Sequence, residues 1–115
     1  MQTILLIDDQ ETNLEYLNSL LSRLSDVDCV NYLSPVEGLK WLKENRPNLI
    51  ILDYRMPHMN GVELTREIRK INSLNRVPIL MVSSETEHNI FSNAVDEGAN
   101  DFILRPFDRT EFMAR

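Results

Sequence analysis

The fold is decided by one short stretch, IILDYRMPHMNG, at residues 50–61. Its three leading aliphatic residues predict a strand that is covered on both faces, which is typical of parallel sheets. The apolar run ends abruptly at Asp53, and a loop with Met, Pro and Gly follows. A helix is predicted after the loop, because Asn60 lies three residues before Glu63 in the capping-box spacing. The chemistry of this chain is therefore expected where its buried strands end.

The same alternation of an apolar run and a helical pattern occurs five times along the 115 residues. The first, third and fourth runs are almost continuous in Ile, Leu and Val, whereas the second alternates and predicts an edge strand. The predicted strands cover residues 3–7, 28–33, 48–52, 78–82 and 101–104. Right-handed crossovers then predict an α/β fold, an open and doubly wound five-stranded parallel sheet with helices on both faces.

Capping signals mark the start of each predicted helix, as a capping residue three positions before a Glu. The five pairs are Thr12–Glu15, Ser34–Glu37, Asn60–Glu63, Ser84–Glu87 and Asp108–Glu111. Apolar stripes at helical spacing follow two of them, at Leu14, Leu17, Leu21 and Leu24 and at Leu64, Ile68 and Ile71. Pro35 suits the first position of its helix, and Gly98 predicts a left-handed end to the fourth helix.

Composition excludes several classes of function. The formal net charge is −6, from 12 Lys and Arg against 18 Asp and Glu, which argues against nucleic-acid binding by this domain. No apolar run approaches the roughly 20 residues of a membrane span, so we expect a cytoplasmic domain without membrane contact. The single cysteine, Cys29, is interpreted as a small core residue in a reducing compartment. His58 and His88 are predicted to be solvated rather than metal ligands.

Polar side chains follow four of the five predicted strands. Asp8 and Asp9 follow the first, Asp53 the third, Ser83 the fourth and Arg105 the fifth. Ligands of doubly wound sheets bind outside the carboxyl ends of the strands, so these groups are expected to converge there. A set of carboxylates without His or Cys favours Mg²⁺. An aspartate nucleophile, a metal and a cationic donor together amount to an aspartyl-phosphate site.

Six short motifs lie at or near the ends of the predicted strands. They are IDD (7–9), LD (52–53), MPHMNG (56–61), VSS (82–84), GANDF (98–102) and RPF (105–107). With them, the whole chain resembles the receiver domains of two-component response regulators. The resemblance implies a flavodoxin-like strand order of 2-1-3-4-5, five helices and a Mg²⁺ cofactor. It also implies a signalling domain rather than an enzyme, phosphorylated by a sensor histidine kinase or a phosphotransfer protein.

The resemblance assigns roles to the acidic residues. Asp53 would accept the phosphoryl group from a phosphohistidine. Asp9 would bind Mg²⁺ directly and Asp8 largely through water, with Asp53 and the backbone carbonyl of Arg55 completing the protein's share of the metal shell.

The remaining site roles also follow from the resemblance. Ser83 and Arg105 would bind the phosphoryl oxygens, and Phe102 would be the aromatic switch that turns inward as Ser83 moves. Arg55 and Glu85 occupy the positions that tune dephosphorylation, and an ion pair between them would slow the access of water. The face of the fourth helix, fifth strand and fifth helix would then change its affinity for a downstream output domain or partner, with a phosphorylation-linked homodimer as one form of response.

Two features depart from the family pattern. Arg105 occupies a position that is almost always Lys in receiver domains, and Arg is planar and able to bind two oxygens at once. The last helix begins at Asp108 and has only about two turns before the chain stops, which is short of a typical helix. We therefore expect residues 1–115 to be a receiver domain whose last helix is truncated and whose output module lies downstream.

Three alternatives stay open from the sequence. A phosphorylation-independent docking domain would explain Arg105 as drift. A metal-dependent phosphatase would need a second Asp two residues after Asp53, where this chain has Arg55. A flavin-binding protein of the same fold is disfavoured by only 3 Gly and by carboxylates that would repel a flavin phosphate.

Overall fold

A computed structural model describes residues 2–84 and 88–114 of the chain. Five parallel strands form one sheet in the order β2-β1-β3-β4-β5. The strands are β1 (Gln2–Ile7), β2 (Val27–Tyr32), β3 (Leu49–Asp53), β4 (Ile79–Ser83) and β5 (Asp101–Leu104). The predicted doubly wound sheet and its strand order are confirmed, and the alternating second strand lies at an edge of the sheet.

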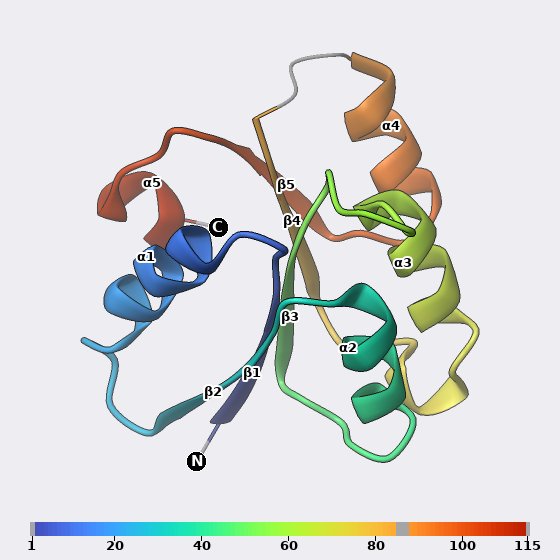
Figure 1. Ribbon diagram of the computed structural model, residues 1–115, viewed down its shortest axis with the longest axis horizontal. Helices are drawn as coiled ribbons and strands as arrows, with labels where there is room; N and C mark the ends of the chain where they lie inside the picture. The colour runs from blue at the N-terminus through green and yellow to red at the C-terminus, as the bar shows by residue number, and fades with distance from the viewer. Residues whose placement is uncertain (1, 85–87, 115) are drawn as a thin grey trace.

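Helices cover both faces of the sheet (Figure 1). One face carries α1 (Glu11–Leu21) and α5 (Arg109–Met113), and the other carries α2 (Pro35–Leu42), α3 (Gly61–Arg69) and α4 (His88–Asp96). A short 3₁₀ helix, η1 (Asn72–Leu74), follows α3 and was not predicted. Within the described ranges, every helix is too short or too polar to cross a bilayer.

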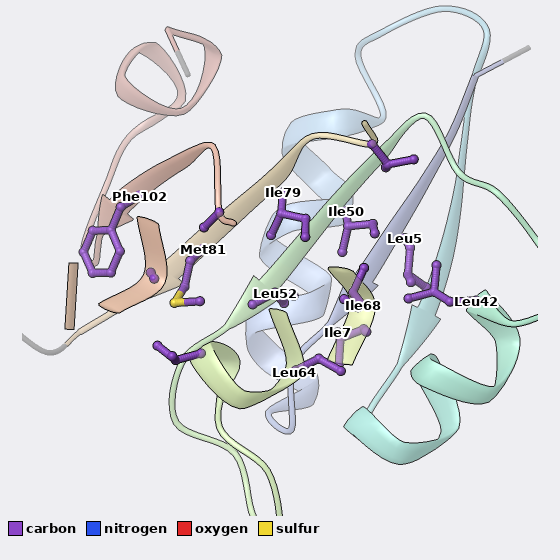
Figure 2. Close-up of a cluster of buried hydrophobic side chains, with 14 of the residues drawn as sticks. Leu5, Ile7, Leu42, Ile50, Leu52, Leu64, Ile68, Ile79, Met81 and Phe102 are labelled. Carbon is purple, nitrogen blue, oxygen red and sulfur yellow. The ribbon is translucent and has the colours of Figure 1, made fainter. Parts of the chain in front are cut away.

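The strands β1, β3 and β4 are largely apolar because each of them supplies side chains to two cores. Successive side chains point to opposite faces, so Leu5 and Ile7 pack towards α2, α3 and α4 while Ile4 and Leu6 pack towards α1 and α5. Figure 2 shows the first of these clusters, in which Ile50 and Leu52 of β3 lie at the centre. Burial on both faces makes β3 a rigid platform for its last residue, Asp53.

Most of the predicted helix starts are confirmed. The side chains of Ser34, Asn60 and Asp108 each accept the backbone N–H of the residue three positions ahead, and Asn60 forms a complete capping box. The predicted cap at Ser84–Glu87 lies partly outside the described residues. Gly98 has a φ of +113°, which confirms the left-handed end after α4.

The prediction for the first helix was wrong in two respects. The helix begins at Glu11, with Gln10 at the N-cap and without a side-chain cap, so the pair Thr12–Glu15 does not start it. The reason is a turn in which the Asp8 carboxylate accepts the Gln10 N–H, at 2.9 Å, and brings the chain into the helix earlier. Leu24 lies beyond the end of α1 and is 41% exposed, so it does not belong to the apolar stripe.

Candidate functional site

Three carboxylates meet at the carboxyl edge of the sheet. Asp8 and Asp9 follow β1, and Asp53 is the last residue of β3, one position further than the predicted end of that strand. One oxygen from each side chain lies within 4.8 Å of the other two. Asp8 is 1% exposed and Asp53 is 7% exposed, so two of the three charges are removed from bulk water. The sequence-based prediction that these residues converge is confirmed.

The loop after β3 is shaped by Gly61. Its backbone N–H donates to the carbonyl of Tyr54, at 2.7 Å, so the start of α3 returns to the base of the acidic cluster. A Cβ atom at this position would lie 2.5 Å from the carbonyl oxygen of Asp53 and 3.0 Å from the Cα of Tyr54. Both are backbone atoms of the buried strand end and cannot move aside freely. Glycine is therefore required for α3 to approach Asp53 this closely.

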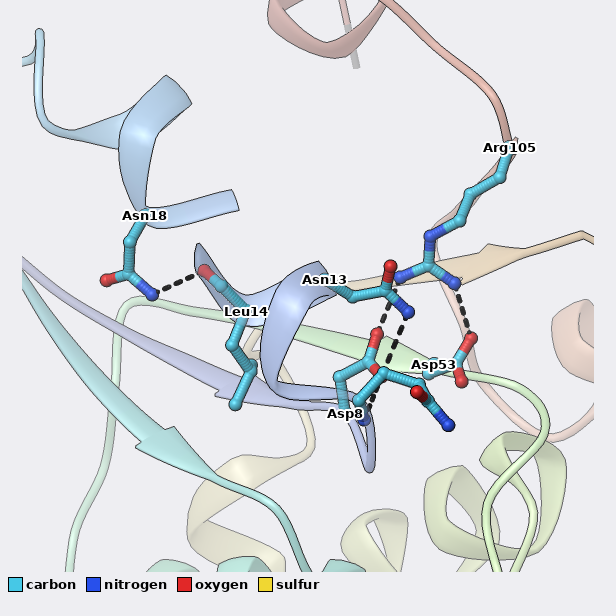
Figure 3. Close-up of polar contacts among 7 residues, drawn as sticks. Asp8, Asn13, Leu14, Asn18, Asp53 and Arg105 are labelled. Atoms are coloured by element: carbon cyan, nitrogen blue, oxygen red, sulfur yellow. Dashed lines mark hydrogen bonds and ion pairs between the residues drawn. The ribbon is translucent and has the colours of Figure 1, made fainter. Parts of the chain in front are cut away.

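Arg105 joins two of the carboxylates through both arms of its guanidinium (Figure 3). Its Nη1 donates to Asp53 Oδ1 at 2.7 Å, and its Nη2 donates to Asp8 Oδ2 at 2.6 Å. Its side chain is 19% exposed, so these are partly buried, charge-assisted hydrogen bonds of the stronger kind. Sequence reasoning predicted Arg105 as a donor at this edge but not its contact with Asp8.

The pKa of Asp53 reflects the balance of charges in the cluster. Burial, the neighbouring charge of Asp8 and a smaller contribution from Asp9 raise the pKa of Asp53 from its ordinary value of 3.8 to about 6. The hydrogen bond and the positive charge of Arg105 oppose this rise. A cation at this edge therefore favours the ionised, nucleophilic form of Asp53.

Two further residues of the site escaped the sequence analysis. Asn13, in the first turns of α1, donates its side-chain N–H to Asp8 Oδ1 at 3.3 Å, whereas Arg105 donates to Oδ2 of the same carboxylate. The hydroxyl of Tyr16 donates to the backbone carbonyl of Phe107 at 2.7 Å, and the two rings lie 5.7 Å apart. Together they join α1 to Asp8 and to the segment after Arg105. The only available signal was their place in the helix that follows the two aspartates.

The remaining predicted residues lie around this edge. Ser83 ends β4 and is 1% exposed, and its carbonyl accepts the backbone N–H of Arg105 at 2.7 Å. Phe102 is 9% exposed and pairs with Met81 across β4 and β5 (Figure 2). Arg55 is exposed in the loop after β3, whereas Glu85 lies outside the described residues, so an ion pair between them stays a prediction. The exposed side chain of His58 confirms that it is solvated.

The donor set fits a small divalent cation. Carboxylate oxygens are hard ligands, and the three residues that can approach one point contribute no nitrogen or sulfur. Mg²⁺ usually takes one or two carboxylates and keeps several waters, which suits a cluster with one partly exposed member, Asp9.

Comparison with known proteins places the chain among signalling domains. The family model for the response regulator receiver domain matches residues 4–115. The chain belongs to this family. Chemotaxis protein CheY1 of Helicobacter pylori (strain J99 / ATCC 700824) is 31% identical to it over 105 residues, which cover 90% of this chain and 85% of CheY1. Receiver domains act in two-component signalling together with histidine kinases and output domains, and they bind Mg²⁺ at an acidic pocket.

Two other similar proteins place this receiver domain in different contexts. The cyclic di-GMP phosphodiesterase response regulator RpfG of Xanthomonas campestris pv. campestris (strain 8004) is 29% identical over 113 residues, which cover 97% of this chain and 30% of RpfG. The receiver domain of the sensor histidine kinase PA1611 from Pseudomonas aeruginosa PAO1 has a TM-score of 0.88 and 27% identity, over 98% of this chain and 92% of that one. That structure holds a magnesium ion in its active-site cleft. The chain thus spans less than a third of the length of RpfG.

Proposed function

We propose that this receiver domain is a phosphorylation-controlled switch in which Asp53 accepts a phosphoryl group from a phosphohistidine on a sensor histidine kinase or a phosphotransfer protein. The observation that carries the proposal is the placement of Asp53. Its carboxylate ends a strand that is buried on both faces, within 4.8 Å of oxygens from Asp8 and Asp9 and 2.7 Å from Arg105. Phosphoryl transfer depends chiefly on such positioning and on neutralising charge.

The transfer step needs only one nucleophile from the protein. An oxygen of Asp53 attacks the phosphorus, a P–O bond forms and the P–N bond to the donor histidine breaks. The imidazole leaves with the electron pair and takes up a proton. Arg105 and the Ser83 hydroxyl then donate hydrogen bonds to the phosphoryl oxygens, and the two-armed guanidinium suits this task because it can bind two oxygens at once.

The metal ligands in this proposal are Asp8, Asp9, Asp53 and the backbone carbonyl of Arg55. Mg²⁺ held there supplies positive charge that offsets the repulsion between the carboxylates and the incoming phosphoryl group. Asp8 is already oriented by the Gln10 N–H and by Asn13, so its carboxylate keeps one direction without further ordering.

The signal leaves the site through β4 and β5. Phosphorylation draws Ser83 towards the new oxygens, Phe102 shifts with it, and the face formed by α4, β5 and α5 changes its affinity for a downstream output domain or a partner protein. Among the side chains that the structure describes, α4, β5 and α5 each expose a large apolar residue, namely Val95, Leu104 and Met113. Such residues suit a contact surface, including one between two phosphorylated copies of the domain.

The rival functions predict different chemistry at the same edge. A metal-dependent phosphatase would release many product molecules per protein, and it would need an acid or base where the exposed Arg55 lies. In our proposal the domain catalyses only its own phosphorylation and dephosphorylation, so labelling stops at one phosphoryl group per chain. A docking domain that is independent of phosphorylation would not be labelled.

The decisive experiment is intact mass spectrometry after incubation with Mg²⁺ and acetyl phosphate. We expect the mass of one phosphoryl group to be gained, to be lost in Asp53→Asn and to be retained in Asp28→Asn, a matched change at an exposed carboxylate on the edge strand β2. Catalytic turnover of a generic phosphate ester would favour the phosphatase. An unlabelled and folded protein in the presence of Mg²⁺ would favour the docking domain.

A further inference from the structure

The guanidinium of Arg105 lies on the same carboxylates that are proposed to hold the metal. Nη1 is 2.7 Å from Asp53 Oδ1 and Nη2 is 2.6 Å from Asp8 Oδ2 (Figure 3). Asp8 and Asp53 are two of the three side chains that can approach one metal position. The positively charged side chain of Arg105 therefore occupies the place where a metal cation is expected to bind.

An arginine can form this bridge where a lysine would not. The planar guanidinium presents two parallel donors, and here each arm serves a different carboxylate. A lysine ammonium is a compact point charge, and we expect it to neutralise one carboxylate well or two poorly. The bridge is also shielded, because Asp8 and Asp53 are 1% and 7% exposed. Low exposure strengthens the attraction between Arg105 and the carboxylates, and it equally strengthens its repulsion of a second cation.

We propose that Arg105 sets the Mg²⁺ affinity of this domain by acting as an internal counter-ion that the metal must displace from Asp8 and Asp53. The inference rests on the proposed function, because it uses the same carboxylates as the metal site. The metal and the guanidinium compete for the same two carboxylates, so the observed affinity is the intrinsic affinity reduced by the fraction of molecules in which Arg105 has moved away. Residue 105 is thus a determinant of metal affinity as well as a donor to the phosphoryl group.

A groove next to the site can accommodate the displaced side chain of Arg105. A groove of about 320 Å³ lies beside the site and is lined by Asn13, Tyr16, Arg105, Pro106 and Phe107. The backbone next to Arg105 is fixed at two points, by the hydrogen bond from its own N–H to Ser83 and by the bond from Tyr16 to the Phe107 carbonyl. Displacement therefore requires rotation of the Arg105 side chain into the groove and leaves the strand end in place.

The proposal predicts opposite effects of residue 105 on stability and on metal binding. Without divalent cations, the melting temperature should fall in the order wild type, Arg105→Lys, Arg105→Gln, because the carboxylates lose their counter-ion. The rise in melting temperature on adding Mg²⁺ should follow the reverse order. For Arg105→Lys we expect Mg²⁺ to bind about tenfold more tightly than to the wild type.

The test combines calorimetric titration with Mg²⁺ and thermal unfolding in chelator or in saturating Mg²⁺, at about pH 8 so that the carboxylates are ionised. The set comprises the wild type, Arg105→Lys and Arg105→Gln, with Arg66→Lys as a matched change at an exposed arginine on α3. Asp9→Asn tests the metal site separately, since Asp9 is not bound by either arm of Arg105 in the described contacts.

Each outcome has a distinct meaning. Tighter Mg²⁺ binding and a larger melting shift in both Arg105 variants, with Arg66→Lys unchanged, support the proposal. Equal Mg²⁺ affinity in the wild type and the Arg105 variants, lost only in Asp9→Asn, overturns the counter-ion role and leaves the proposed metal site intact. An equal drop in melting temperature with and without Mg²⁺ means that Arg105 is merely structural and also overturns it. If the wild type and both Arg105 variants fail to bind Mg²⁺, the metal site of the proposed function falls together with this inference.

Discussion

The two edges of the sheet each contain a partly buried arginine, and the two arginines have different partners. Arg105, at the carboxyl edge, donates to two carboxylates. Arg69, near the start of β4 and β5 at the amino edge, donates four hydrogen bonds, of 2.7–3.0 Å, to neutral oxygens of Leu74, Gly98 and Asn100. Burial lowers the pKa of Arg69.

This difference in partners shows that a partly buried arginine can either stabilise the fold or act as a replaceable counter-ion. The guanidinium of Arg69 donates to neutral oxygens that lie away from the proposed metal site, so no bound cation competes with it, and it fixes α3 to the segment between α4 and β5. A guanidinium that neutralises carboxylates holds a position that another cation can take. We therefore expect the amino edge to determine stability and the carboxyl edge to determine the response to ligands.

The largest predicted effect separates the two edges most clearly. Arg69→Ala removes four hydrogen bonds and, among the described contacts, leaves the Gly98 carbonyl without a donor, so the free energy of unfolding should fall by about 4 kcal/mol. The midpoint of Mg²⁺ titration should not change. Urea unfolding with and without Mg²⁺ measures both quantities, and Arg66→Ala one turn earlier on α3 is the matched control, because its partner Glu97 is on the surface. A loss below about 1 kcal/mol would show that water replaces Arg69 easily.

A pH dependence should distinguish the carboxyl edge. The folded state raises the pKa of Asp53 from 3.8 to about 6, so it binds this proton more tightly than the unfolded chain does. The contribution of Asp53 to stability is therefore greatest below about pH 4 and is lost as the pH rises through about 6, a change of about 3 kcal/mol.

The measurement is urea unfolding in chelator across this pH range, for the wild type and for Asp53→Asn. The difference between the two proteins should grow by about 3 kcal/mol from pH 4 to pH 7, with the variant becoming relatively more stable. Arg69→Lys, at the other edge, should keep the wild-type profile. Parallel profiles of the wild type and Asp53→Asn would contradict the prediction.

A smaller effect is expected from the glycine beside Arg69. Gly98 has a φ of +113°, and a Cβ atom there would lie 2.7 Å from Cγ of Arg69. We expect Gly98→Ala to cost about 2 kcal/mol from backbone strain and crowding together. In an Arg69→Ala background the crowding disappears, so the same change should cost about 1 kcal/mol. If Gly98→Ala lowered the free energy of unfolding equally in both backgrounds, as measured by urea unfolding, the Arg69 side chain would be moving aside at no energetic cost.

The sequence predicted the carboxyl edge far better than the amino edge, and the reason is physical. Asp8, Asp53, Ser83 and Arg105 each follow or end a strand, so their convergence follows from the strands being parallel. Three of the four hydrogen bonds of Arg69 go to backbone carbonyls up to 29 residues away, and backbone groups leave no mark in a sequence. The fourth goes to the side chain of Asn100, 31 positions away. The short helix η1 was missed because its residues have no apolar spacing of their own.

The helix-capping rule failed where a side chain of the site forms a hydrogen bond with the neighbouring backbone. The cap of α1 was wrong because Asp8 accepts the Gln10 N–H and starts the helix early. At Asn60 the same rule succeeded, because among the described contacts its side chain bonds only within the cap and the full capping box forms. The bridge from Arg105 to Asp8 was also beyond the sequence, because it depends on the reach and rotamer of one side chain across 97 positions.

The smallest predicted effect tests how strongly Asp8 depends on each of its donors. Its Oδ1 accepts the Gln10 N–H at 2.9 Å and Asn13 at 3.3 Å, while Oδ2 accepts Arg105 at 2.6 Å. The bond from Asn13 is the longest of the three and both other donors survive its removal, so Asn13→Ala should lower the free energy of unfolding by only about 0.5 kcal/mol. Mg²⁺ affinity should change less than in Arg105→Lys, because the counter-ion stays in place. A loss above about 1.5 kcal/mol in urea unfolding would mean that Asp8 is held mainly by α1, and the carboxyl edge would then resemble the rigid amino edge more than an exchangeable site.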